Sequence, residues 1–265
     1  MEKKKTTISK TDIILVLLLL GVVVYEIISF VYGNNNTMQS MLDITITRTI
    51  AGIFFLIIAI RRSYKLCSFD GRRSIILYLS ILPCFIIVIN NLPIIALIKG
   101  EAIVNASWVY IFVFILQCFA IGFFEEIAFR GVFFLLVLKE RHHNKLQLFR
   151  IIVISSVIFG MYHLFNLFEG ASPIAVIMQV GYSALIGAMC TMIFLQTRNI
   201  IIPIIIHAGF DFCGMLVPTL GEGKIWNLPT IIITVILSVA VFLYMLTLYL
   251  KYDTETVNQF YKDLQ

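Results

Sequence analysis

Three short polar groups interrupt apolar stretches of this sequence, and their residue types are those of a hydrolytic site. The first group has two adjacent carboxylates followed by an arginine, the second is a lone histidine, and the third is a histidine followed by an aspartate. These candidate catalytic residues are Glu125, Glu126, Arg130, His163, His207 and Asp211. Charged residues near a bilayer centre cost at least ~2.5 kcal/mol each, so such residues need partners or a polar cavity.

Two kinds of hydrolytic chemistry fit this set of residues. A desolvated carboxylate beside another carboxylate can act as a general base on a water molecule, while an imidazole holds the water or stabilises an oxyanion. In the second kind, His163, His207 and Asp211 hold a divalent metal such as zinc, which generates the nucleophile. The residues alone leave both routes open, and no other cofactor is indicated.

The spacing within the groups predicts which side chains share a helix face. Glu126 and Arg130 are four residues apart, as are His207 and Asp211, so each pair can make a charge-assisted contact along a helix. Glu125 is turned by about 100° from Glu126 around the helix axis. We therefore expect the two carboxylates to do different jobs.

The composition assigns the chain to the membrane. Of 265 residues, 60% are hydrophobic and 13% are charged, about half the ~25% charged share of a soluble domain. The net charge of +5 comes from basic clusters between apolar runs, which indicates membrane topology and not nucleic-acid binding. The five cysteines show no CxxC spacing, so neither a disulfide framework nor a thiolate zinc site is expected.

Apolar stretches long enough to cross the bilayer predict an all-α, polytopic integral membrane helix bundle of about eight transmembrane helices. We expect a single membrane domain over residues 1–265, with a core at 108–217 that carries the three polar groups and additional N-terminal helices within 1–100. The predicted spans are 12–33, 43–60, 74–98, 107–138, 148–168, 174–195, 200–217 and 228–250.

The distribution of Lys and Arg predicts the orientation. If the termini and every second loop share one side of the membrane, that side holds sixteen of the twenty basic residues, and the opposite loops hold only Lys99 and Lys224. This asymmetry places both termini in the cytoplasm. The fourth stretch, 107–138, would measure about 48 Å as a helix, so we expect it to tilt, break or protrude.

Counting along each helix from its nearest cytoplasmic basic residue puts the three polar groups at overlapping depths, which is compatible with one shared site. Purely structural roles are alternatives to a catalytic one. Glu126 and Arg130 could form a structural ion pair, His163 could make an interhelical hydrogen bond, and His207 and Asp211 could form an orienting pair. Glu26 and Arg48 are expected near the non-cytoplasmic ends of their spans, snorkelling or paired with each other.

The pattern EExxxR, then FxxxH, then HxxxD, each on its own predicted membrane helix, resembles the CAAX protease and bacteriocin-processing family of intramembrane metalloproteases. This family is related to the eukaryotic type II CAAX prenyl endopeptidase. The resemblance covers roughly Trp108 to Val217. It implies that Glu125 activates the attacking water and that His163 helps to hold it.

By the same resemblance, His207 and Asp211 stabilise the oxyanion or complete the water site, Glu126 supports them, and Arg130 orients the carboxylates. Asp211 stands where the eukaryotic enzyme has Asn. An ionised Asp accepts hydrogen bonds but does not donate them, so its role stays open. A metal-dependent and a metal-free mechanism also both stay open.

We therefore expect an intramembrane endopeptidase, a hydrolase that cleaves a hydrophobic peptide or membrane-protein substrate near the cytoplasmic half of a bacterial plasma membrane. Its partners would be that substrate and the lipid bilayer, with no nucleic acid. Two alternatives compete: a non-catalytic bacteriocin-immunity or scaffold protein, and a proton-coupled transporter.

Overall fold

The computed structural model describes residues 36–67, 79–139, 144–168 and 170–264, together with a few isolated positions between 14 and 25. Most of the predicted first span, 12–33, therefore lies outside the described residues, as does Glu26. The count of about eight spans and the cytoplasmic placement of both termini stay predictions.

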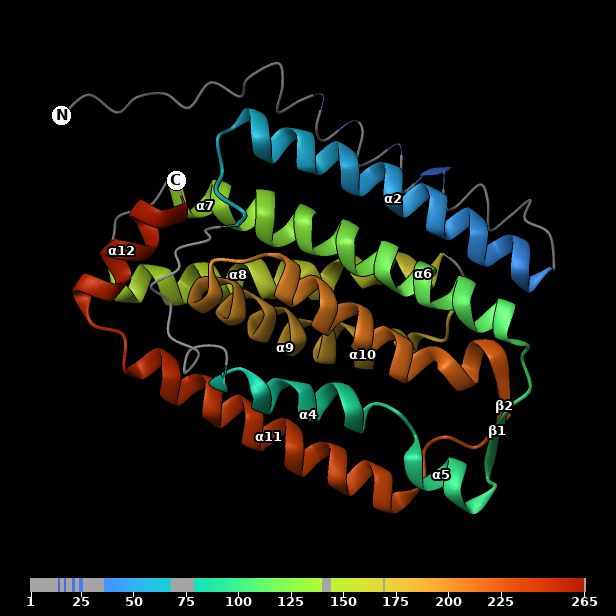
Figure 1. Ribbon diagram of the computed structural model, residues 1–265. Coiled ribbons are helices and arrows are strands. Elements are labelled where there is room, and N and C mark those ends of the chain that lie inside the picture. The colour runs from blue at the N-terminus through green and yellow to red at the C-terminus, as the bar shows by residue number, and fades with distance from the viewer. Residues whose placement is uncertain are drawn as a thin grey trace.

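The described part of the chain is a bundle of helices, which confirms the all-α polytopic fold (Figure 1). Six helices in it are long and apolar enough to cross a membrane. They are α2 (Thr37–Arg61), Trp108–Leu138, Lys145–Leu167, α9 (Pro173–Thr197), α10 (Ile201–Leu220) and α11 (Leu228–Leu250). A further helix, α12 (Thr254–Leu264), follows α11.

The predicted span 74–98 is not one continuous helix in its described part. It forms α4 (Leu82–Asn90) and α5 (Ile94–Lys99), with a turn between them that ends at Pro93. The break follows from the proline, which has no backbone N–H to donate and disfavours a helical conformation in the residue before it.

A two-stranded antiparallel ladder closes one end of the bundle. Strand β1 (Ala102–Val104) lies before α6 and pairs with β2 (Gly221–Gly223), which follows α10 directly. The ladder therefore ties the start of α6 to the end of α10, so these two helices run in opposite directions side by side (Figure 1).

The long fourth stretch neither stops nor turns, but its hydrogen bonding changes within the helix. Helix α6 (Trp108–Glu126) passes into a π-helical segment, η1 (Ile127–Phe134), and then into α7 (Leu135–Lys139). Such π segments are rare and are frequently found at functional sites. Here the change from α to π begins directly after the two adjacent carboxylates.

Helix α6 lies at the centre of the bundle, packed against α2 on one side and α10 on another, while α8 (Lys145–Tyr162) packs against α9. Two glycines allow these close approaches. A Cβ on Gly122 of α6 would lie 3.0 Å from the Ile204 carbonyl oxygen of α10. A Cβ on Gly160 of α8 would lie only 2.5 Å from the Val180 carbonyl oxygen of α9.

The contact at Gly160 predicts a large difference between two Gly→Ala variants. Gly160→Ala forces a methyl group against the backbone of α9, and such overpacking costs about 1–3 kcal/mol. Gly181→Ala, on α9, is the matched control because a Cβ there meets nothing within 4 Å. Thermal unfolding in detergent should show a lowered midpoint for Gly160→Ala and an unchanged or slightly raised one for Gly181→Ala; equal midpoints would contradict the packing.

Candidate active site

A buried carboxylate, Glu126, joins two helices at the centre of the site. Its Oε1 atom accepts a hydrogen bond from Arg130 Nη1 at 2.8 Å and lies 2.7 Å from Nδ1 of His207 on α10. Glu126 is fully buried and Arg130 is 2% exposed. The predicted contact between Glu126 and Arg130 is present, although Arg130 lies in the π segment.

The Arg130 guanidinium is enclosed by two further helices. It lies over the Phe159 ring of α8, 4.3 Å from the ring centroid. A Cβ on Gly187 of α9 would lie 2.8 Å from Arg130 Nη2. A glycine at position 187 therefore leaves the space that the guanidinium occupies, and the aromatic face stabilises its charge.

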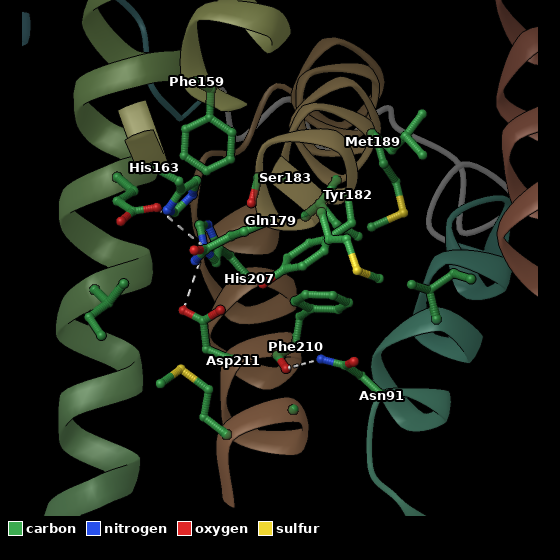
Figure 2. Close-up of a pocket in the computed structure, with 18 of the residues that line it drawn as sticks. Asn91, Phe159, His163, Gln179, Tyr182, Ser183, Met189, His207, Phe210 and Asp211 are labelled. Carbon is green, nitrogen blue, oxygen red and sulfur yellow. Dashed lines mark hydrogen bonds and ion pairs between the residues drawn. The ribbon is translucent and has the colours of Figure 1, made fainter. Parts of the chain in front are cut away.

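The hydrogen bond to Glu126 fixes the orientation of the His207 ring. Because an ionised carboxylate only accepts hydrogen bonds, Nδ1 of His207 carries the proton in this contact. The other ring nitrogen, Nε2, lies 3.5 Å from Glu125 Oε2 and 3.5 Å from Asp211 Oδ2. Both distances exceed those of an ordinary N–H···O hydrogen bond. His207 is thus anchored on one side and faces two carboxylates on the other (Figure 2).

The two adjacent carboxylates have different surroundings. Glu125 is 3% exposed and lines a cavity, and its Oε2 atom has no hydrogen-bond partner within the described chain. Glu126 lies behind the cavity wall, held by Arg130 and His207. Of the two adjacent carboxylates, only Glu125 therefore faces the cavity.

His163 lies where α8 ends and a short 3₁₀ segment, η2 (His163–Leu167), begins. Its ring packs edge-on against Phe159, with centroids 5.4 Å apart, and against Tyr162 at 5.8 Å. Phe159 also contacts the His207 ring at 5.8 Å. Phe159, the phenylalanine of the FxxxH pattern, thus packs against both imidazole rings.

Four of the six predicted site residues line one large cavity of about 1540 Å³. These four are Glu125 from α6, His163 from the end of α8, and His207 and Asp211 from α10. The last three are labelled in Figure 2. Small-molecule pockets usually measure about 300–1,000 Å³, so this cavity has room for a segment of peptide.

The geometry does not support the metal site that His163, His207 and Asp211 suggest from the sequence. Among the described residues, no group of three or more His, Cys, Asp or Glu side chains is arranged to hold a metal ion. We therefore derive no chemical step through a metal.

Carboxylates and imidazoles from several helices thus gather around one cavity of a multi-pass helical protein, an arrangement that intramembrane hydrolases use. A comparison with protein-family models makes this specific: residues 106–213 match the model described as type II CAAX prenyl endopeptidase Rce1-like. This match supports membership of the CAAX protease family, and all six predicted site residues lie within the matched region. Comparisons with curated proteins and with solved structures gave no match.

A seventh polar residue, Arg48, does not lie where the sequence predicted it. Because α2 begins at Thr37, Arg48 is the twelfth of its 25 residues and lies near the middle of the helix, not near its end. Arg48 Nη1 donates a hydrogen bond to the Tyr162 hydroxyl at 2.6 Å, and the guanidinium lies 4.9 Å from the centroid of the Phe124 ring. Arg48 also lines the cavity. The position of Arg48 within the helix follows from where α2 begins, and hydropathy locates the start of a helix poorly.

We expect Arg48→Met to slow peptide cleavage about tenfold, because a hydrogen bond from a charged group contributes about 1.5–3 kcal/mol and this one holds Tyr162, the neighbour of His163. Arg61→Met is the matched control, since Arg61 is exposed at the C-terminal end of the same helix. The measurement is the cleavage rate together with the unfolding midpoint. A rate that equals the control's would show that Arg48 does not position the site.

Proposed function

We propose that this protein is an intramembrane endopeptidase in which Glu125 activates the attacking water. The observation that carries the proposal is the difference between the two adjacent carboxylates. Each carboxylate has one buried oxygen, Oε2, without a hydrogen-bond partner in the described chain, but Glu126 Oε1 is held by Arg130 and His207. Only Glu125 lines the cavity, and its contact with His207 Nε2 is long, at 3.5 Å. A desolvated carboxylate in this position is suited to act as a general base.

In the proposed reaction, Glu125 takes a proton from a water molecule that His163 helps to hold. The water oxygen forms a bond to the substrate's carbonyl carbon, and the carbonyl oxygen becomes a tetrahedral oxyanion. The C–N bond then breaks, and the departing amine takes the proton from Glu125. The water molecule thus supplies a hydroxyl group to the new carboxylic acid and a proton to the amine.

His207 is suited to stabilise the oxyanion in this reaction. When its ring is protonated on both nitrogens, Nδ1–H stays on Glu126 and Nε2–H is a donor toward the cavity. Asp211, 3.5 Å from Nε2, balances the positive charge of that ring. This gives Asp211 a role that needs no hydrogen-bond donation. A donor fixed in place before reaction, away from bulk water, is an effective way to stabilise developing charge.

The walls of the cavity favour a hydrophobic substrate. Apolar side chains such as Ile121, Met189 and Phe210 make up much of the lining around the polar groups. The site also lies among helices that can cross a membrane. We propose that the substrate is a hydrophobic or membrane-anchored peptide and that the protein works in a bacterial plasma membrane.

The test is cleavage of a library of hydrophobic peptides by liposome-embedded protein, followed by mass spectrometry. We expect Glu125→Gln to lower the rate by about 10²–10⁴-fold, the usual contribution of a general base. Glu255→Gln, an exposed carboxylate on α12, is the control and should cleave like the wild type. A chelator should leave the wild-type rate unchanged.

Two results would count against the proposal. Equal turnover by Glu125→Gln and the wild type would remove Glu125 from the chemistry. Failure of well-folded wild-type protein to cleave any peptide in the library would favour a non-catalytic binding protein. Loss of activity in the chelator, restored by zinc, would instead favour a metal-dependent reaction.

A further inference from the structure

A second buried polar group lines the cavity away from Glu125. Gln117 on α6 is only 6% exposed, and its Oε1 atom has no hydrogen-bond partner within the described chain. The side chain is one of those that line the cavity. A buried acceptor without a partner is unfavourable, so a group bound in the cavity would relieve this cost if it brought a donor.

The position of Gln117 relative to the proposed catalytic base follows from the helix. Gln117, Ile121 and Glu125 are spaced by four residues, and all three line the cavity, so they form one stripe along α6. Eight residues at ~1.5 Å each separate Gln117 from Glu125 by about 12 Å. Gln117 lies on the side of Glu125 that faces the β1–β2 ladder.

Helix α10 brings a second acceptor to this end of the cavity. Gly214 lies one turn beyond Asp211 and also lines the cavity. Its carbonyl would normally accept from the backbone N–H of the residue four positions later, but that residue is Pro218, which has no N–H. The regular helical hydrogen bond to the Gly214 carbonyl is therefore missing.

The side chain of Asn91, from α4, packs against the same glycine. A Cβ on Gly214 would lie 2.3 Å from Asn91 Nδ2, and that nitrogen donates to the Phe210 carbonyl at 2.8 Å (Figure 2). Asn91 is itself a cavity-lining residue. Three helices thus bring amide and carbonyl groups to one end of a mainly apolar cavity.

We propose that Gln117 and the Gly214 carbonyl form a subsite that binds the main chain of an extended peptide. Both acceptors call for N–H donors, which a peptide backbone supplies at regular intervals and lipid acyl chains lack. At ~3.4 Å per residue, 12 Å corresponds to about three to four residues of extended chain. The subsite therefore contacts the substrate about three to four residues from the bond that Glu125 attacks.

This inference rests on the proposed function for the peptide nature of the ligand, and it adds how the peptide is held. Recognition at this subsite depends on the backbone N–H and not on the side chain that accompanies it. Peptides of different apolar sequence are therefore held in the same way, while removal of one particular N–H weakens binding.

The test measures binding to full-length Glu125→Gln protein in detergent, so that no cleavage interferes. The probe is a fluorescein-labelled peptide with a non-repeating sequence of Leu, Ala, Val and Phe, used with a series in which one backbone nitrogen at a time is methylated. We expect methylation at one position, or at two neighbouring ones, to weaken binding about tenfold, which corresponds to one lost hydrogen bond.

Adding Gln117→Met should itself weaken binding about tenfold and should remove most of the sensitivity to methylation at that position. Gln179→Met is the matched control, because Gln179 also lines the cavity but its Oε1 already accepts from Asn166 at 2.8 Å. Peptide binding to the Gln179→Met control should remain sensitive to methylation at that position. Equal binding of all methylated peptides, or unchanged position dependence in Gln117→Met, would overturn the subsite.

The outcomes separate this inference from the proposed function. Cleavage that needs Glu125 but shows no dependence on Gln117 would retain the endopeptidase and reject the subsite. Position-dependent binding through Gln117, in a protein whose wild type cleaves none of these peptides, would support the subsite and count against the endopeptidase.

Discussion

The site depends on one buried carboxylate, Glu126, shared between Arg130 and His207. Charges inside a membrane protein are tolerated when they are paired and hydrogen-bonded, and removing one partner leaves the others uncompensated. This contact joins the junction of α6 and the π segment to α10, and it fixes which nitrogen of His207 faces the cavity. In the proposed mechanism, Glu126 is engaged in this contact and Glu125 acts as the base.

The surrounding bundle is built so that this contact can form. Gly122 lets α6 approach the backbone of α10, and Gly187 leaves space for the Arg130 guanidinium. Phe159 then covers Arg130 and contacts both imidazoles. Small residues and one aromatic ring thus set the distances between helices, and the polar groups meet because those distances are short.

The sequence predicted the helical fold and placed the polar groups at depths compatible with one shared site, because charged groups in apolar stretches are costly unless they share a partner or cavity. It failed where the outcome depends on local backbone chemistry or on which way a side chain points. The turn at Pro93 divides a span predicted to be continuous, and the start of α2 at Thr37 moves Arg48 to mid-helix. Gln117 could not be singled out, since its importance lies in a buried atom without a partner.

The most direct test compares the free energies of unfolding of Glu126→Gln and Glu125→Gln, measured by chemical denaturation in detergent. Glu126→Gln should lower it by up to about 3–5 kcal/mol, the cost of breaking a buried ion pair. Glu125→Gln should leave it unchanged or raise it, because Glu125 Oε2 has no hydrogen bond in the described chain and its contact with His207 Nε2 is long, at 3.5 Å, whereas Glu126 Oε1 makes two short contacts. Equal losses, or a larger loss for Glu125→Gln, would contradict the division between a structural Glu126 and a reactive Glu125.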